Sequence, residues 1–224
     1  MSVAEGLASI RDRIDRAARA ASRDPAEVLL IAVSKTKPAA AIREAYAAGQ
    51  RDFGENYAQE LVQKAEELAD LTEVRWHFIG HLQSNKARFI AKVAHVVHTV
   101  DGPSLARELG KRVAKEGRER LPVLVEVNVG GEAQKHGSSA GDLLDVLAAV
   151  EAEPGLRLLG LMTVPPNERE GARRAFEALS SLRSLHGGRA RLPELSMGMS
   201  DDLEVAIACG STMVRVGTAI FGSR

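Results

Sequence analysis

The sequence has few of the residues that mark several classes of protein. Its one cysteine, Cys209, lies in an apolar stretch, which excludes an internal disulfide and predicts a small buried side chain. It has only one Trp, two Tyr and five Phe, too few to suggest base-stacking platforms. The 30 basic and 30 acidic residues leave no net charge. We therefore expect no attraction to nucleic acid or to an anionic membrane.

Long apolar segments are also missing. The stretch from Met1 to Arg23 is charged throughout, and no other stretch approaches the length of a membrane span. We therefore expect a cytoplasmic protein without a membrane partner. The 224 residues can bury one sizeable core, and no stretch reads as a linker, so a single domain over residues 1–224 is expected. We expect this domain to be a monomer.

Apolar bursts rich in β-branched residues alternate with amphipathic helical patterns along the whole chain. A first amphipathic helix ends before Asp24 and Pro25. Eight strands are predicted, at residues 28–34, 51–55, 75–80, 95–100, 122–129, 157–164, 193–197 and 213–217. Eight such units predict an α/β fold, a single TIM-type (β/α)8 barrel with an extra N-terminal helix. An open doubly wound sheet shows the same alternation and stays an alternative.

The first predicted strand ends at Lys35. The run Val28 to Val33 is apolar throughout and is typical of a parallel strand buried on both faces. A lysine at the mouth of such a sheet loses hydration, which lowers its pKa and frees the amine to form an imine with a carbonyl. Taken alone, the stretch favours a simpler interpretation, in which Lys35 and Lys37 are solvated residues before a helix that Pro38 opens.

Polar residues follow the other predicted strands as well. Because functional residues of parallel barrels gather where strands end, we expect these side chains to share one rim. The residues are Glu55, Asn56, Gly80, His81, Asp101, Gly102, Asn128, Met162, Thr163, Ser196, Met197, Arg215, Gly217 and Thr218.

The last two units suggest an anion site. Gly217 and Thr218 offer backbone N–H groups and a hydroxyl, and Ser200 is predicted to cap a helix over residues 201–209. A phosphate would fit this cradle, although a capped helix without a ligand explains the pattern equally well. Asp201 and Asp202 would suit the helix dipole but repel a phosphate. No nucleotide-binding glycine motif is present, so the phosphate would belong to a smaller group.

Arg215 lies among apolar strand residues. A guanidinium in that position needs a buried acceptor or must face the barrel mouth. A ring nitrogen of a ligand would serve as the acceptor; the alternative is a carboxylate such as Glu126 or Asp52.

Two histidine pairs raise the question of a metal. His77 and His81 are four residues apart and His95 and His98 three apart, but strand geometry does not bring such pairs together. We therefore expect no metal site. His81 is expected on the rim, as a hydrogen-bond partner of a ligand or a loop.

Several blocks of sequence, taken together, are specific to one protein family. They are AVSKTKP (32–38), FGENYAQE (53–60), WHFIGHLQSNK (76–86), LSMGMSDDLEVAI (195–207) and VRVGTAIFG (214–222). On these motifs the chain resembles the pyridoxal phosphate (PLP) homeostasis proteins from about Leu29 onward. The resemblance implies a barrel similar to the N-terminal domain of alanine racemase, that is PLP fold type III, with PLP as the cofactor. It implies cofactor-binding roles for Lys35 (imine), Asn56 (ring pocket), Arg215 (pyridine nitrogen), and Ser200, Gly217 and Thr218 (phosphate).

Two observations bear on catalysis. Racemisation needs acid/base groups on both faces of the imine, and in the similar racemases a partner subunit supplies the second as a tyrosine. This chain has only Tyr46 and Tyr57. An arginine at the ring nitrogen also disfavours protonation of the ring and weakens its electron sink.

We therefore expect a non-catalytic PLP carrier that maintains vitamin B6 and amino-acid/keto-acid homeostasis, with PLP-dependent apo-enzymes as partners. The alternatives are a PLP-dependent amino-acid racemase and an aldolase that uses Lys35 as a Schiff-base amine without a cofactor.

Overall fold

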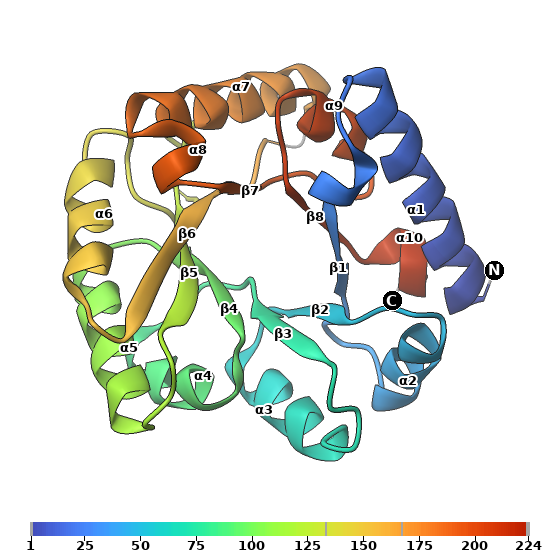
Figure 1. Cartoon of the computed structure of the whole chain (residues 1–224), viewed down its shortest axis with the longest axis horizontal. Helices are drawn as coiled ribbons and strands as arrows, with labels where there is room; N and C mark the ends of the chain where they lie inside the picture. Colours follow the sequence, from blue (N-terminus) through green and yellow to red (C-terminus); the bar gives the residue numbers. More distant parts are fainter. Residues whose placement is uncertain (1, 133, 167, 223–224) are drawn as a thin grey trace.

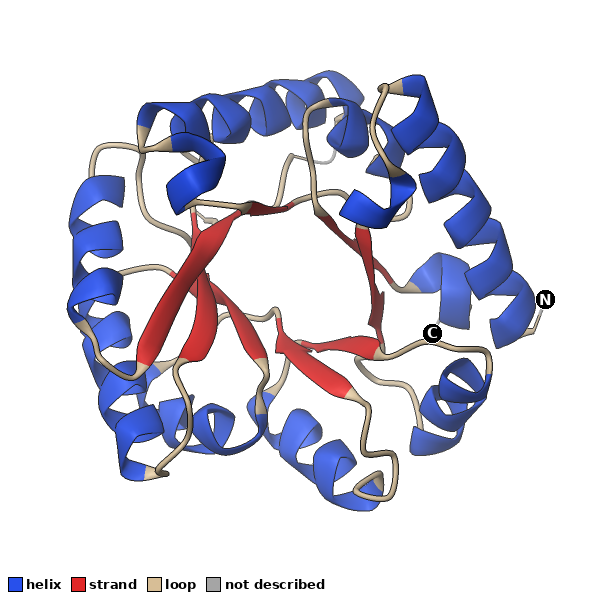
Figure 2. Ribbon diagram, viewed as in Figure 1, coloured by secondary structure: helices blue, strands red, loops and turns tan. Residues whose placement is uncertain are grey.

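Eight parallel strands close into a barrel in the computed structural model, which describes residues 2–132, 134–166 and 168–222. Figure 2 shows the strands as an inner ring and the helices as an outer one. The strands are β1 (Leu29–Val33), β2 (Asp52–Glu55), β3 (Arg75–Phe78), β4 (Val96–Val100), β5 (Leu121–Glu126), β6 (Leu156–Met162), β7 (Glu194–Ser196) and β8 (Met213–Val216). The predicted TIM-type barrel is confirmed, and the open doubly wound alternative is wrong.

The ring closes where the first strand meets the last. β1 pairs with β8 in parallel from Leu29 opposite Met213 to Ala32 opposite Val216, and it pairs with β2 on its other edge. Each strand has a neighbour on both sides, so the described sheet has no open edge to leave backbone groups unpaired. The carboxyl ends of all eight strands therefore lie on one rim.

The helices cover the outside of the barrel (Figure 1). They are α1 (Val3–Ala20), α2 (Ala39–Ala47), α3 (Ala58–Glu67), α4 (Ala87–Val93), α5 (Pro103–Lys115), α6 (Leu143–Ala152), α7 (Arg169–Leu185), α8 (Gly188–Arg191), α9 (Leu203–Ala208) and α10 (Thr218–Phe221), with short 3-10 helices η1 (Pro25–Glu27) and η2 (Ser84–Lys86). The apolar stripe of α5, formed by Leu105, Leu109 and Val113, is buried. None of the helices in the described ranges is long and apolar enough to cross a membrane.

The two faces of the strands build two different cores. Leu30 and Ala32 of β1 belong to the large apolar core between sheet and helices. Ile31 lies between them and packs instead with Leu124 and Met162 in a small separate cluster. Because side chains alternate along a strand, that cluster fills the barrel interior. It is only part of the filling, since buried polar side chains occupy the same interior.

The extra N-terminal helix is packed against the end of the chain. α1 begins with a capping box of Ser2 and Glu5 and lies against α9 and α10 (Figure 1). A Cβ atom on Gly6 would lie 2.9 Å from the carbonyl oxygens of Ala219 and Ile220. Glycine at this position therefore allows α1 to approach the backbone of α10 closely.

Candidate functional site

A cavity of about 550 Å³ opens at the carboxyl ends of β1, β2 and β8. All six residues predicted to bind a cofactor line it. Its lining consists of Val33, Lys35, Asn56, Ile79, Val164, Met199, Ser200, Asp201, Arg215, Gly217, Thr218 and Ala219. Residues far apart in the sequence thus meet around one space of the size that holds small-molecule ligands.

Hydrogen bonds of the two neighbouring residues hold the loop that carries Lys35. The Ser34 hydroxyl donates to Glu55 Oε1 at 2.7 Å, and the backbone N–H of Thr36 donates to Glu60 Oε1 at 2.6 Å. Thr36 has a φ of 62°, a left-handed conformation that residues other than Gly, Asn and Asp rarely adopt. The polar contacts on both sides hold the chain in this strained turn and fix the point from which Lys35 extends.

The buried ammonium of Lys64 contacts both carboxylates that hold the Lys35 loop, those of Glu55 and Glu60. Lys64 Nζ lies 2.7 Å from Glu55 Oε1, 2.7 Å from Glu60 Oε1 and 2.7 Å from the carbonyl oxygen of Ser34. Burial raises the pKa of Glu55, and the hydrogen bonds from Lys64 and Ser34 oppose that effect. Lys64 therefore organises the loop beneath Lys35 from within the structure.

The second lysine of the motif serves a different contact. Lys37 Nζ donates to the carbonyl oxygens of Phe221 and Gly222, at 3.2 and 3.0 Å. It does not belong to the cavity lining. Lys35 and Lys37 are thus distinguished by position, one at the cavity and one at the end of α10.

Asn56 presents an unsatisfied acceptor. Its Oδ1 atom is buried and has no hydrogen-bond partner among the described residues. Such atoms are uncommon in folded proteins, and this acceptor is available to a ligand in the cavity that Asn56 lines. The backbone of Gly80 passes so close that a Cβ atom there would overlap the Asn56 carbonyl. Glycine at position 80 is therefore a condition for this placement of Asn56.

The turn at Ser200 differs from the prediction. α9 begins at Leu203, not at residue 201, and Ser200 is not its N-cap. The Asp202 carboxylate instead accepts a hydrogen bond from the Met199 N–H at 2.6 Å, which closes a turn before the helix starts. The predicted helix over residues 201–209 is thus wrong at its first turn, because Asp202 competes for the backbone there. Asp201 lines the cavity.

Gly217 and Thr218 line the cavity, Gly217 directly before α10 and Thr218 as its first residue. A Cβ atom on Gly217 would lie 3.2 Å from the Val33 carbonyl oxygen and 3.3 Å from the Val33 Cβ. A side chain at position 217 would therefore crowd Val33 of β1.

Arg215 is buried, with 5% of its surface exposed, and its guanidinium bonds to neutral oxygens. Nη1 donates to Ser196 Oγ at 2.6 Å and Nη2 to the Thr163 carbonyl at 2.9 Å. In the described part of the chain it forms no ion pair with Glu126 or Asp52, so the direct carboxylate partner is wrong. Burial lowers the pKa of Arg215 to about 10, against the attraction of Glu126 and Asp202, so it is a cation at neutral pH.

Glu126 lies near this cation at the end of β5. Burial raises the pKa of Glu126 to about 7, and the charge of Asp101 adds to the effect while Arg215 opposes it. Its Oε2 atom is buried without a hydrogen-bond partner among the residues described.

His81 contacts the loop that follows β5. Its ring stacks on His136 with centroids 3.7 Å apart, and its Nδ1 lies 3.5 Å from Asp101 Oδ2. Ligand atoms of His81, Asp101 and His136 lie within 4.8 Å of one another, a grouping that the sequence spacing did not suggest. His77 and His98, on neighbouring strands, hydrogen-bond to each other at 2.9 Å, a pair that spacing within one strand does not reveal.

Sequence reasoning also missed Arg13. This residue of α1 donates from Nη2 to the Ser200 carbonyl at 2.9 Å and forms an ion pair with Glu204. An arginine on an amphipathic helix gives no signal of such a contact in the sequence, and only the packing of α1 against α9 reveals it.

Comparisons with known proteins agree with this geometry. The family model of the alanine racemase N-terminal domain matches residues 6–224. A pyridoxal phosphate homeostasis protein from Pseudomonas aeruginosa is 52% identical, over 100% of this chain and 96% of its own length. The protein of the same name from Escherichia coli is 47% identical, over 99% of this chain and 97% of its own.

Solved structures give the same result. PipY of Synechococcus elongatus with PLP bound has a TM-score of 0.83 and 39% identity, and the match covers 99% of this chain and 100% of PipY. Alanine racemase from Corynebacterium glutamicum shares the fold, with a TM-score of 0.67, 20% identity, and coverage of 97% of this chain and 62% of the racemase. The barrel, the cavity and these matches together show that the chain belongs to the family of pyridoxal phosphate homeostasis proteins, built on the alanine racemase N-terminal domain.

Proposed function

We propose that this protein binds PLP reversibly at the rim cavity and maintains vitamin B6 and amino-acid/keto-acid homeostasis without turnover of its own. The observation that carries the proposal is the convergence of Lys35, Asn56 and Arg215 with the Ser200 turn and the start of α10 on one cavity. The PLP-bound structure of a relative with 39% identity supports the choice of ligand.

The residues present fit this ligand. When bound, PLP supplies an aldehyde that a lysine amine can attack, and Lys35 is the lysine that lines the cavity. Arg215 offers guanidinium N–H groups suited to an unprotonated ring nitrogen. Asn56 brings a buried acceptor, and Ser200 and Thr218 bring hydroxyls suited to a phosphate.

The surroundings of the tyrosines support a carrier over a racemase. Tyr46 hydrogen-bonds Glu73 and stacks on Arg51, which precedes β2 at the opposite end of the barrel. Tyr57 is 53% exposed, and neither tyrosine belongs to the cavity lining. A second acid or base opposite Lys35 would have to come from another group. A cationic arginine at the ring nitrogen would weaken the ring as an electron sink.

We propose that residues 1–224 act as a single monomeric PLP-binding domain in the cytoplasm. PLP-dependent apo-enzymes, which need the cofactor that this cavity would release, are the proposed recipients.

A spectrum of the purified protein with PLP tests the proposal, followed by borohydride reduction and mapping of the labelled peptide. We expect a visible band and a label on Lys35, both lost in Lys35→Ala and both kept in the matched control Lys37→Met. A label on another lysine would contradict the assignment. Without added cofactor, aldol cleavage that depends on Lys35 would favour the aldolase. Exchange of amino-acid α-deuterium by the loaded protein would favour the racemase.

A further inference from the structure

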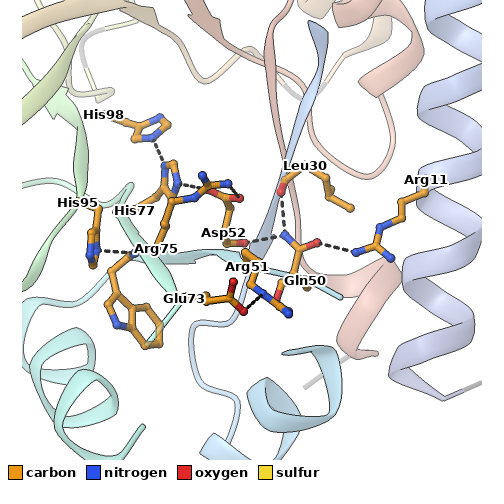
Figure 3. A network of polar contacts seen from close by, with 11 residues as sticks. Arg11, Leu30, Gln50, Arg51, Asp52, Glu73, Arg75, His77, His95 and His98 are labelled. Atoms are coloured by element: carbon orange, nitrogen blue, oxygen red, sulfur yellow. Dashed lines mark hydrogen bonds and ion pairs between the residues drawn. The ribbon is translucent and has the colours of Figure 1, made fainter. Parts of the chain in front are cut away.

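A line of buried polar side chains crosses the interior of the barrel from the cofactor cavity. Starting at Arg215 Nη1, it passes through Ser196 Oγ (2.6 Å), then His98 Nδ1 (2.9 Å from Ser196), His77 Nδ1 (2.9 Å from His98 Nε2) and Asp52 Oδ1 (2.9 Å from His77 Nε2). Figure 3 shows the end of this line away from the cofactor cavity, from His98 through His77 to Asp52, together with Arg75.

The line joins two ends of the barrel. Arg215 lines the cofactor cavity, whereas Asp52 and Arg75 line a second hollow, of about 490 Å³, beside the start of β2 and β3. Asp52 forms an ion pair with Arg75, whose side chain is 57% exposed. The members between these ends are almost fully buried.

The hydrogen atoms of this line can be placed by starting from the Asp52 carboxylate. Burial acts to raise the pKa of Asp52, but hydrogen bonds from His77 and Arg75 outweigh it and hold the pKa below its usual value. Asp52 is therefore a carboxylate, which only accepts, so His77 donates from Nε2–H. Burial also lowers the pKa of His98 well below its usual value, so His98 is neutral.

Two directions would satisfy the two histidines. With a neutral His77, His98 donates from Nε2–H to His77 Nδ1 and accepts at Nδ1 from the Ser196 hydroxyl. With a cationic His77, both bonds reverse, and Ser196 Oγ receives two donors. Its own hydroxyl hydrogen, at a residue with no exposed surface, then has no acceptor among its contacts in the described structure. An unsatisfied buried donor is costly, so the first direction is favoured.

We propose that this one-directional relay of four buried side chains positions the Arg215 guanidinium as a donor at the cofactor cavity. The four positioning residues, which we call the buried relay, are Asp52, His77, His98 and Ser196. In this arrangement the Ser196 hydroxyl donates to His98 Nδ1, and its oxygen accepts from Arg215 Nη1. Because a guanidinium only donates, Ser196 accepts from Arg215 in either direction; the bond from Ser196 to His98 satisfies the buried hydroxyl and fixes the orientation of the Oγ that holds Arg215 Nη1. This role of Arg215 rests on the proposed function.

The protonation pattern can be tested on the cofactor-free protein. We would label the histidines with ¹⁵N and record long-range ¹H–¹⁵N correlations, with His77→Gln and His98→Gln to assign the signals. We expect both rings to be neutral and protonated at Nε2 alone. A His98 protonated at Nδ1, or a cationic His77 at neutral pH, would overturn the proposed direction. This result does not depend on whether the protein binds PLP.

The positioning role is tested with a pair of variants at His98. Gln can both accept from Ser196 and donate to His77, whereas Met has similar size but neither function. We expect His98→Met to lose about tenfold or more in PLP affinity and to shift the visible band, because a bond to a charged group is left unsupported. His98→Gln should stay within about threefold of wild type.

Equal affinity and spectra for the two His98 variants would overturn the relay. Ser196→Ala gives an independent test if His98→Met does not fold, and it should show the same loss with a melting temperature that proves folding. Ser196→Ala with wild-type affinity and spectrum would likewise overturn it. A wild-type protein that binds no PLP and carries no reducible label would instead overturn the proposed function.

Discussion

The guanidinium of Arg13, on the helix that precedes the barrel, donates a 2.9 Å hydrogen bond to the backbone carbonyl of Ser200 at the cavity rim. The same side chain is paired with Glu204 of α9. α1 thus contributes to the proposed phosphate end of the cavity, although none of its residues lines the cavity itself. The contact holds the Ser200 turn from the outside.

Arg13→Met should loosen that turn. We expect PLP affinity to fall by about tenfold, as one bond from a charged donor is lost, while affinity for unphosphorylated pyridoxal changes little. Binding titrations with both aldehydes measure the effect. Arg16→Met serves as the control, because Arg16 pairs with Asp12 on an exposed face of the same helix. Equal losses for both aldehydes would show that the Ser200 turn does not hold the phosphate.

Lys64→Met should destabilise the protein strongly. The substitution leaves the fully buried Glu55 and its neighbour Glu60 without their shared cation, and breaking a buried ion pair in this way costs about 3–5 kcal/mol. Urea unfolding measures the free energy. Arg43→Met is the control, since it breaks an exposed pair with Asp70, for which we expect about 1 kcal/mol or less. A small effect of Lys64→Met would mean that the loop carrying Lys35 does not depend on the Lys64 ammonium.

Glu126 should make stability fall as pH rises. Its pKa is about 7 in the folded chain against an ordinary 4.5, so between these values the folded state holds a proton that the unfolded state has released. The free energy of unfolding therefore decreases as pH rises through this window, by about 3 kcal/mol in all, and Glu126 causes no further change above it.

The variant Glu126→Gln isolates that contribution. Urea unfolding of both proteins from about pH 5 to about pH 8 should show wild type losing stability relative to the variant as pH rises. A constant difference between them would contradict the raised pKa of Glu126.

The alternation of apolar segments and amphipathic helical patterns was enough to predict all eight strands, because most residues of each strand are buried. The ends of the strands were less predictable. The fifth strand was predicted over residues 122–129 but ends at Glu126, since Asn128 donates its N–H to the Ser138 carbonyl instead of extending the sheet. Such local loop contacts leave no periodic signal.

For the site, the strand-end argument and the family resemblance together predicted six residues that line one cavity, but neither could find the buried relay. His77 and His98 lie on adjacent strands, and His77 pairs in register with Val96, so His98 lies two residues further along β4. Two histidines on neighbouring strands and on the same face are a usable signal, provided that the strands are known to be adjacent. Spacing within one strand, which the sequence shows directly, carries no information about such a pair.

The closure of β1 on β8 also has a consequence for how the protein is made. Lys35 follows the first strand and Arg215 lies in the last, so the two sides of the cavity come from opposite ends of the chain. Pairing of strands so distant in sequence is slow, because the entropy of the intervening chain is lost before the contact stabilises the fold. A nascent chain should therefore remain unable to capture the cofactor until its last strand has emerged and paired with the first.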